Sequence, residues 1–364
     1  MPKVLIVIAR LNVGGTAQYI SELTNGLLAR GYEVLVATGF VQGAEVEDDV
    51  ASTLPLHRIE SLGRKISLRD DLSARNELRD LIDTFKPDLI YSHTFKAGLL
   101  ARTIKSDIPR IHAFHGHLLF EPELTGWKVR IVVALERVLA RRANVLVTVG
   151  ERVASELTSE KVGTSANYVS IAPGVRPLEI KDRETARREL GIHDETRPIV
   201  VWMARVTAVK APQRVADIAR AIPHARFLLA GGGDLVDQVT KNLPDNLSYA
   251  GWQPATTMWA VADVAISTSE NEGMPVALIE AQLAGIPVVA VDVGSVSEVI
   301  EDQKTGYVLP NFGSEFISRT RELVESVDQR NSLSRAASKF ASQHFSPELL
   351  IKRHLALFDE VIKS

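Results

Sequence analysis

The chain has 364 residues, of which 45% are hydrophobic and 24% charged, an ordinary globular composition that excludes a disordered or fibrous protein. The 42 Lys and Arg residues nearly balance the 45 Asp and Glu residues, so no general basic field favours nucleic acid as a partner. The absence of cysteine excludes disulfides, thiolate zinc sites, iron–sulfur clusters and a cysteine nucleophile.

The N-terminal apolar run, Val4–Ala9, is too short for the core of a secretion signal, and no small-residue cleavage site follows it. No window is apolar over the roughly 20 residues that a membrane-spanning helix needs. We therefore expect a cytoplasmic protein.

Short apolar runs rich in Val and Ile recur along the chain, and each is followed by a helical pattern. In the first half the runs are Val4–Ala9, Val34–Thr38, Leu89–Ser92, Ile111–Phe114, Val145–Val149 and Tyr168–Ala172. In the second half they are Ile199–Ala204, Arg226–Ala230, Leu247–Ala250, Val264–Thr268, Val288–Val291 and Gly306–Leu309. Continuous apolar runs are typical of parallel strands covered by helices on both faces. The predicted fold class is α/β, with two Rossmann-like, doubly wound parallel sheets.

The predicted domains are residues 1–173 and 174–346, because two prolines and a glycine interrupt the pattern at 173–177. The prediction joins the C-terminal helix, 347–364, to the first domain, although the pattern alone does not place it. The structural alternative is a single (β/α)8 barrel, for which twelve strands are too many.

The segment 127–142 carries five basic residues and one acid. One interpretation is a helix that packs on its sheet through Ile131, Leu135, Val138 and Leu139. The alternative is a basic face that rests on anionic lipid at the inner membrane surface.

The most informative motif runs from Glu272 to Pro287. Pro275 suits the first position of a helix and Gly285 suits its left-handed stop, so a helix of about ten residues is expected after Glu272. Glu272 would then lie in the loop before the helix and Glu280 inside it. The free N–H groups of the first turn suit a phosphate, and the two carboxylates suit sugar hydroxyls. The alternative is an ordinary loop acid and a helix-surface acid.

Two further loops of the second half follow strands, at the edge where open α/β sheets bind ligands. Arg205 and Lys210 lie five residues apart after the first strand and could clamp a diphosphate, or could simply be solvated. Gly231-Gly232-Gly233 follows the next strand and allows a ligand to approach the backbone closely, or is an ordinary tight turn.

In the first half, Gly14-Gly15 follows the first strand, and His115-Gly116-His117 follows Ile111–Phe114. The two histidines could bind zinc, but no third ligand accompanies them at metal-site spacing. We expect no metal site, a polar role for His115 at the sheet edge, and local packing or hydrogen bonding for His93.

Three absent motifs narrow the chemistry. No Asp-x-Asp pair is present to hold a divalent ion on a diphosphate. No GxxxxGK[ST] and no GxSxG occurs, which excludes P-loop phosphoryl transfer and hydrolases with a nucleophile elbow.

Taken in order, these stretches resemble the retaining glycosyltransferases of family 4, whose GT-B fold has two Rossmann-like domains facing across a cleft. The resemblance covers nearly the whole chain: a Gly-Gly loop, a His-Gly, an Arg-x4-Lys, a glycine-rich turn and a Glu-x7-Glu. The stretches 92–98 and 114–117 are most similar to bacterial transferases of cell-surface polysaccharide assembly. Ala204, Ala211 and Pro275 depart from the family, because glycine is usual at all three positions.

The resemblance implies catalytic roles for Glu272, His115, Arg205 and Lys210. Arg205 and Lys210 would hold the donor diphosphate, and Glu272 and His115 would contact the transferred sugar. The residues with implied donor contacts are Gly14, Gly15, Arg205, Lys210, Gly231, Trp252, Gln253, Glu272, Gly273, Met274, Val276, Ala277 and Glu280. Among them Glu280 would bind the ribose, the backbone at Trp252 and Gln253 the base, and the Val276 and Ala277 amides the diphosphate.

The function that follows is a metal-independent, retaining transfer of a hexose or N-acetylhexosamine from a nucleotide sugar, with UDP as first choice. The acceptor would be a glycan or a lipid-linked saccharide, and no cofactor is expected, because the nucleotide sugar is a substrate. A nucleotide-sugar epimerase of the same fold and a non-catalytic nucleotide-sugar-binding subunit remain alternatives. An NAD-dependent dehydrogenase would require GxGxxG after a first strand, and neither half has it.

Overall fold

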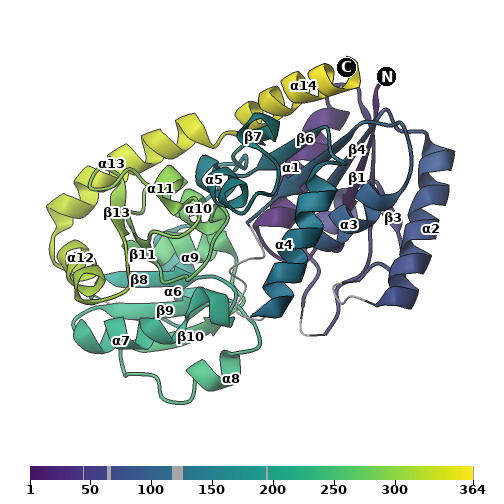
Figure 1. Cartoon of the computed structure of the whole chain (residues 1–364). Helices are drawn as coiled ribbons and strands as arrows, with labels where there is room; N and C mark the ends of the chain where they lie inside the picture. Colours follow the sequence, from purple (N-terminus) through teal and green to yellow (C-terminus); the bar gives the residue numbers. More distant parts are fainter. Residues whose placement is uncertain (44, 64–66, 117–125, 194–195, 364) are drawn as a thin grey trace. The chain divides into compact units, whose positions relative to one another are not determined.

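The computed structural model describes residues 1–43, 45–63, 67–116, 126–193 and 196–363. The chain divides into two compact units (Figure 1). The first contains Met1–Gly174 and Pro347–Ser364, and the second contains Val175–Ser346. The boundary lies between Gly174 and Val175, one residue from the predicted one.

The first unit is built on a seven-stranded, all-parallel sheet in the order β3-β2-β1-β4-β5-β6-β7. Its strands are β1 (Lys3–Ile8), β2 (Glu33–Thr38), β3 (Leu56–Arg58), β4 (Leu89–His93), β5 (Arg110–Phe114), β6 (Val145–Thr148) and β7 (Tyr168–Ser170). Its helices are α1 (Gly15–Leu28), α2 (Leu68–Phe85), α3 (Phe95–Thr103), α4 (Trp127–Ala140), α5 (Glu151–Ser159) and α14 (Pro347–Lys363), with 3-10 turns at Asp49–Thr53 and Ser165–Asn167.

The sequence pattern missed β3. This strand has only three residues, Leu-His-Arg, all of them half-buried, so it shows no continuous apolar run. The strand forms because β2 offers it a free edge: Val36, Ala37 and Thr38 pair with its three residues. The first sheet therefore has seven strands, where six were expected.

The C-terminal helix α14 packs on α1 within the first unit. Gly26 on α1 makes the close approach possible, because a Cβ there would lie 2.2 Å from Cδ1 of Ile351 on α14. A buried hydrogen bond adds to the contact: Tyr19 Oη on α1 lies 3.2 Å from His354 Nε2 on α14. The last helix of the chain thus completes the layer that covers one face of the first sheet.

The second unit is built on a six-stranded, all-parallel sheet in the order β10-β9-β8-β11-β12-β13. Its strands are β8 (Ile199–Met203), β9 (Arg226–Ala230), β10 (Leu247–Gly251), β11 (Val264–Ser267), β12 (Val288–Val291) and β13 (Gly306–Leu309). Its helices are α6 (Arg183–Glu189), α7 (Gln213–Ala221), α8 (Val236–Val239), α9 (Ala255–Val261), α10 (Val276–Leu283), α11 (Val296–Val299), α12 (Ser314–Glu325) and α13 (Val327–His344), with a 3-10 turn at Ala208–Lys210.

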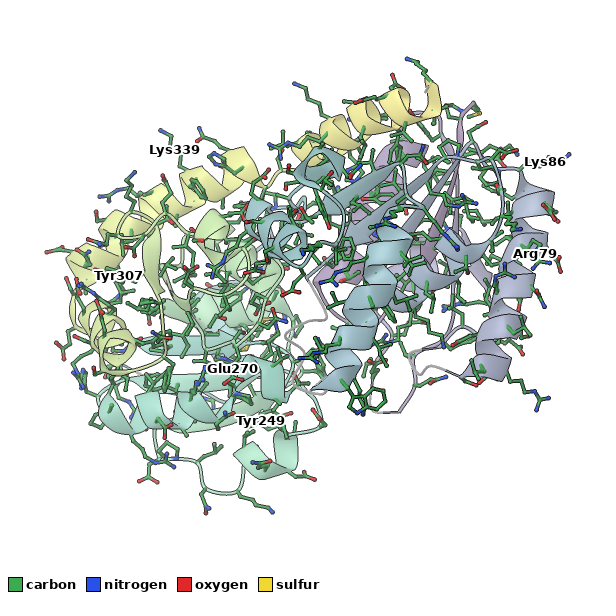
Figure 2. The ribbon with its side chains drawn as sticks, in the orientation of Figure 1. Arg79, Lys86, Tyr249, Glu270, Tyr307 and Lys339 are labelled. Carbon is green, nitrogen blue, oxygen red and sulfur yellow. The ribbon has the colours of Figure 1, made fainter. Side chains whose placement is uncertain are left out.

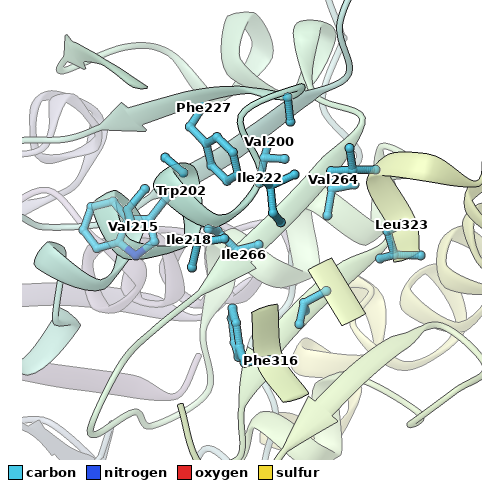
Figure 3. Packing of buried hydrophobic residues seen from close by; sticks show 14 of the residues in the cluster. Val200, Trp202, Val215, Ile218, Ile222, Phe227, Val264, Ile266, Phe316 and Leu323 are labelled. Carbon is cyan, nitrogen blue, oxygen red and sulfur yellow. The ribbon is translucent and has the colours of Figure 1, made fainter. Parts of the chain in front are cut away.

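Buried side chains from strands and helices interlock in the second unit (Figure 3). Trp202 and Phe227 on neighbouring strands pack with Ile218 of α7 and Phe316 of α12, and each is at most 1% exposed. Burying an aromatic or aliphatic side chain of this size contributes roughly 1.5–3 kcal/mol. This core makes the sheet a rigid platform for the loops at its carboxyl edge.

Both sheets reverse their strand order at one point, between β1 and β4 in the first unit and between β8 and β11 in the second. In open α/β sheets, ligands bind beyond the carboxyl ends of the strands at such a switch point. Gly14 follows β1, His93 ends β4, the loop with Arg205 and Lys210 follows β8, and the loop with Glu272 follows β11. The fold thus brings the motif loops of each unit to its switch point.

Helix α4 corrects one prediction. Ile131 and Val138, expected to pack on the sheet, are 54% and 50% exposed, whereas Leu139 is buried as expected. The buried face instead holds Val133, Glu136, Leu139 and Ala140, because the carboxylate of Glu136 forms a buried ion pair with Arg102 of α3 (2.9 Å). The predicted face left out Glu136, and it is therefore rotated relative to the observed one.

None of the helices in the described ranges combines the length and the hydropathy required to span a membrane.

Candidate functional site

Lys210 and Glu272, predicted separately as ligand-binding residues, form an ion pair in the second unit. Lys210 Nζ donates to Glu272 Oε1 at 2.6 Å, and the two side chains are 16% and 9% exposed. Ser269 Oγ donates to the same carboxylate oxygen at 2.7 Å. The pair joins the loop after β8 to the loop after β11, directly at the switch point of the sheet.

Backbone and side-chain hydrogen bonds hold these two loops against each other. The Glu270 N–H donates to Val209 O at 2.8 Å, and Arg214 pairs with the Glu270 carboxylate at 2.7 Å. The one hydroxyl hydrogen of buried Thr268 is shared between the carbonyls of Lys210 and Ala211, and the hydroxyl oxygen accepts from the indole N–H of Trp202. These hydrogen bonds hold the loops of Lys210 and Glu272 in fixed positions relative to each other (Glu270 is labelled in Figure 2).

Arg205 lies on the same loop but is exposed to solvent, and its guanidinium is the more accessible of the two predicted diphosphate ligands. Ala211, where the family usually has glycine, is buried in the left-handed conformation at φ 46°. An L-residue in that region costs roughly 1–2 kcal/mol. The loop therefore takes the left-handed conformation at Ala211 with an alanine and not a glycine.

The glycine-rich turn lies against the Arg205 loop and against Trp252. The Val206 N–H donates to Gly232 O at 2.9 Å, and a Cβ on Gly231 would lie 1.9 Å from Ala204 O. The Trp252 indole covers the turn, since a Cβ on Gly232 would meet its Nε1 at 2.2 Å. At Gly231 only glycine fits, because the clash is with backbone at a φ of 129°. At Gly232 a side chain would require the Trp252 indole to move.

Two neighbours complete the edge around this turn. The hydroxyl of Tyr249, a residue labelled in Figure 2, donates to Gly231 O at 2.8 Å, and Gln253 donates to Ala250 O at 2.9 Å. The indole of Trp252 remains 47% exposed. Gly231, Trp252 and Gln253 are thus brought together at the ends of β9 and β10.

Helix α10 begins at Val276, so Pro275 is its N-cap and not its first residue, and the helix has eight residues where about ten were expected. Val276 and Ala277 occupy the first two helical positions, whose N–H groups have no acceptor within the helix. Gly285 adopts the left-handed conformation after the helix, at φ 74°. The helix start faces the same loop that carries Glu272, Gly273 and Met274.

Glu280 is buried within α10 and only 8% exposed, so it is not the helix-surface acid of the alternative interpretation. Burial raises the pKa of this carboxyl to about 7, and the Trp259 indole opposes the shift. A carboxyl poised near neutrality can present either a proton or a bare oxygen to a ligand.

Sequence reasoning missed Ser269 and the loop Gly294-Ser295, which holds the Glu272 loop from the other side. The Ser295 N–H donates to Gly273 O at 2.8 Å. Gly294 lies at φ 52°, and a Cβ there would meet Glu272 O at 1.8 Å. The signal in the sequence was a lone Val-Gly-Ser after an apolar run, which is too common to single out.

In the first unit, Gly14 is the N-cap of α1 with φ 148°, and Gly15 is the first residue of the helix. One turn later the Tyr19 ring packs edge to face on His115, with centroids 4.8 Å apart. His115 Nε2 lies 2.9 Å from Nδ1 of buried His93. The structure therefore brings the glycine loop, His115 and His93 to the same switch point.

Across the described ranges, no three His, Asp or Glu side chains cluster closely enough to hold a metal ion. His117, the second member of the His-Gly-His motif, lies outside the described residues.

Two parallel α/β units, each with its motif loops at the switch point, define the GT-B class of fold. The crystal structure of the Anabaena HepE protein in complex with UDP and glucose has this fold and superposes with a TM-score of 0.83, at 18% identity, covering 99% of this chain and 100% of that one.

Two family models match the chain, "Glycosyl transferase 4-like domain" at residues 14–174 and "Glycosyl transferases group 1" at residues 182–340. The chain therefore belongs to the glycosyltransferases of family 4, which have the GT-B fold.

Relatives of this kind have varied substrates. The chain is 25% identical over 281 residues to the sulfoquinovosyl transferase SQD2 of Arabidopsis thaliana, covering 70% of this chain and 53% of that protein. It is 24% identical over 273 residues to the UDP-Gal:alpha-D-GlcNAc-diphosphoundecaprenol alpha-1,3-galactosyltransferase of Escherichia coli, covering 69% of this chain and 70% of that one. The chain thus spans about half the length of the plant relative.

Proposed function

We propose that the chain transfers a sugar from a nucleotide sugar, with UDP as first choice, to a glycan or lipid-linked saccharide, with retention of configuration at the sugar. The observation that carries this proposal is the Lys210–Glu272 pair at the switch point, beside the start of α10. The E. coli relative is named for a UDP-sugar donor and a lipid-linked acceptor, and HepE binds UDP, which supports both choices.

When the donor binds, Lys210 and Glu272 would contact different parts of it, the diphosphate and the sugar. Lys210, with Arg205 beside it, would turn to the diphosphate, because an ammonium and a guanidinium are strong partners for phosphate oxygens. The N–H groups of Val276 and Ala277, with the helix dipole behind them, would add to the same site. Glu272, with the amides of Gly273 and Met274, would accept and donate hydrogen bonds to hydroxyls of the transferred sugar.

The nucleoside would lie along the ends of β9 and β10. Glu280 would accept hydrogen bonds from the ribose hydroxyls in its ionised form, and the backbone at Trp252 and Gln253 would contact the base. Gly231 would allow the close backbone approach. In the first unit, Gly14 and Gly15 would approach the donor, and His115 would contact the transferred sugar.

The reaction is a substitution on one face of the sugar. The bond between the anomeric carbon and the phosphate oxygen breaks, and its electron pair stays on the phosphate. The acceptor oxygen then bonds to the anomeric carbon from the same face, and its proton passes to the phosphate oxygen. Arg205, Lys210 and the start of α10 would stabilise the negative charge that grows on the diphosphate, and such electrostatic stabilisation is usually the largest contribution to catalysis.

The test uses the full chain with UDP-sugars and no acceptor, since many transferases slowly transfer sugar to water. We expect UDP release, a product that retains its anomeric configuration, and a rate within about twofold when a chelator is added, because protein cations neutralise the diphosphate. Conversion of the sugar to its epimer without UDP release would indicate the epimerase alternative. Tight binding with no turnover, also with saccharide acceptors, would indicate the binding subunit.

Peripheral contact with an anionic membrane surface would bring the chain to a lipid-linked acceptor, and α4 offers the face for it. Trp127, Ile131 and Val138 are 68%, 54% and 50% exposed. At about 100° per residue their directions fall within roughly 40° of one another, so they form one apolar stripe. Lys128, Arg130, Arg141 and Arg142 flank it, while the helix's single acid is buried. Apolar residues flanked by cations suit a bilayer interface.

Vesicle flotation tests this contact. The chain should float with vesicles containing phosphatidylglycerol and not with pure phosphatidylcholine, and high salt should weaken the binding. Ile131→Ser should reduce flotation, whereas Val327→Ser, at an equally exposed valine of α13, should not. Equal flotation of both variants would contradict a role for α4.

A further inference from the structure

Buried aromatic and imidazole side chains surround His115 in the first unit. His93, the last residue of β4, is fully buried and has its Nδ1 2.9 Å from His115 Nε2. The Tyr19 ring on α1 packs edge to face on the same imidazole. A half-turn of the His115 ring would replace its Nε2 by a carbon opposite His93. The contact with His93 therefore holds the ring in one orientation.

His354 on α14 anchors this arrangement from behind. Its Nδ1 lies 2.9 Å from Leu350 O, and because a carbonyl can only accept, Nδ1 carries the proton. Nε2 is then a bare acceptor, with the hydroxyls of Tyr19 and Tyr91 each 3.2 Å away. Burial lowers the pKa of His354 to about 4, which keeps it neutral in this role near pH 7. Tyr19 is thereby held in the position in which it contacts His115.

The proton between His93 and His115 can be assigned from the partners of each ring nitrogen. A neutral imidazole has one N–H and one bare nitrogen. His93 Nε2 is buried and has no hydrogen-bond partner among the described residues, and its neighbours include the Tyr91 ring, with centroids 4.2 Å apart. An unpaired buried N–H is costly and rare. The hydrogen of His93 therefore belongs on Nδ1, where His115 Nε2 can accept it.

We infer that His93 is a positioning residue, which donates its Nδ1–H to His115 Nε2 and so keeps the His115 hydrogen on Nδ1. His115 then presents an N–H donor to a substrate oxygen and does not serve as a base through its Nε2. Burial lowers the pKa of His115 to about 4 and that of His93 well below its ordinary value, so both rings are neutral near pH 7. The inference rests on the proposed function in one respect, namely that the oxygen accepting from His115 belongs to the transferred sugar.

The first test is spectroscopic and requires no activity. Long-range ¹H–¹⁵N correlation spectra of the full chain, labelled at histidine nitrogens, distinguish protonated from bare ring nitrogens. A His115→Gln variant identifies the His115 signals by their loss. We expect His115 to be protonated at Nδ1 and bare at Nε2. The opposite pattern, or a mixture of the two forms, would overturn the inference even if transfer activity is found.

The second test compares two isosteric variants. In His93→Asn the amide nitrogen can occupy the place of Nδ1 and donate to His115, whereas in His93→Leu nothing can. We expect His93→Leu to shift His115 to a mixture of tautomers and to lower kcat about tenfold, the scale of one neutral hydrogen bond. The donor KM should stay unchanged, because the implied donor contacts are mostly in the second unit. His93→Asn should keep the Nδ1–H form and most of the rate.

Equal spectra and rates for the two variants would overturn the positioning role. If no sugar transfer is detected for the unsubstituted chain, the proposed function fails, and the spectra alone decide the inference. If His93→Leu does not fold, the spectrum of the unsubstituted chain and the His93→Asn variant remain decisive.

Discussion

At the scale of single residues, the second unit places opposite charges in direct contact where a charged ligand is proposed to bind. Lys210 and Glu272 are partly buried, and the short contact at 2.6 Å compensates each charge. The binding roles proposed for them are distinct, one for the diphosphate and one for the sugar. Substituting them separately should therefore have separable effects.

Lys210→Met should weaken UDP binding about 10- to 100-fold and leave uridine binding nearly unchanged, because a charge-assisted bond contributes roughly 1.5–3 kcal/mol and only the diphosphate uses it. Titration calorimetry with both ligands measures the difference. The control is Lys181→Met. Lys181 forms an ion pair with Glu189 outside the motif loops, and the two side chains are 36% and 43% exposed. An equal loss for UDP and uridine would contradict the diphosphate role.

Glu280 should make nucleoside binding depend on pH. Its folded-state pKa of about 7 means that it becomes protonated as the pH falls below neutrality. The ionised carboxylate accepts from the ribose hydroxyls through two charged oxygens, which are stronger acceptors than those of the protonated form, so uridine affinity should fall as the pH drops from 8 to 6. In Glu280→Gln the uridine affinity should be lower at pH 8 and flat over this range, because uridine has no phosphate that titrates there. The same pH profile in both proteins would assign the titration to another group.

At the scale of elements, α10 owes its position to the loop after β12. Gly294 lies at positive φ against the backbone of Glu272, and Ser295 holds Gly273 O. The loop after β11 therefore cannot move without moving the loop after β12. The sheet edge thus fixes Glu272 through backbone contacts, which no side-chain pattern reveals.

Gly294→Ala should destabilise the chain by roughly 2 kcal/mol or more, since it adds the left-handed strain of an L-residue to a clash. It should also reduce sugar transfer by displacing Glu272. Gly191→Ala is the matched control: Gly191 has φ 65° with nothing within 4 Å of its would-be Cβ, so only the conformational cost applies. Urea unfolding and the transfer assay test both variants. Equal effects of the two substitutions would show that the contact with Glu272 O is unimportant.

The predicted elements themselves show what a local pattern can establish. Eleven of the twelve apolar runs differ from the observed strands by at most one residue at either end, and Tyr168–Ala172 extends two residues beyond β7. This agreement follows because strands buried on both faces must be continuously apolar. The face of α4 was wrong because the pattern contains no sign of Arg102 on α3, the partner that makes Glu136 a buried residue.

At the scale of the whole molecule, the two units should respond to acid in opposite directions. Burial lowers the pKa of His93, His112, His115 and His354, all in the first unit. The unfolded chain then binds more protons than the folded one between about pH 4 and 6.5, so the stability of this unit falls as the pH falls. Glu280 in the second unit has the opposite sign, since its folded pKa is raised above the ordinary glutamate value of 4.5.

Calorimetry at pH 7 and pH 5 should therefore show the melting of the first unit moving down, and separating from that of the second. Each histidine contributes at most about 1.4 kcal/mol per pH unit. Hydrogen exchange by mass spectrometry assigns each transition to its unit. Glu280→Gln should remove part of the second unit's stabilisation at pH 5 relative to pH 7. If the first unit melts at the same temperature at pH 7 and pH 5, burial does not keep its histidines neutral in the folded state.

The sequence by itself determined the α/β class, the two parallel sheets and the loops that carry the motifs, because hydrophobic periodicity and Gly or Pro punctuation are local properties of the chain. It also singled out His115, Arg205, Lys210, Glu272 and Glu280 as candidates. Only the tertiary structure decided how these side chains are partnered. The Lys210–Glu272 pair spans 62 residues, and the contact of His93 with His115 spans 22.

Burial also became visible only in three dimensions. Glu280 is poised near neutrality because its surroundings exclude water, and Glu136 turns inward because Arg102 is there to meet it. Desolvation and charge pairing depend on groups that are distant in the chain and adjacent in space, so no spacing of residue types encodes them. The sequence therefore specified which reactive side chains are present. The packing specified the protonation state of each one and the partner that it contacts.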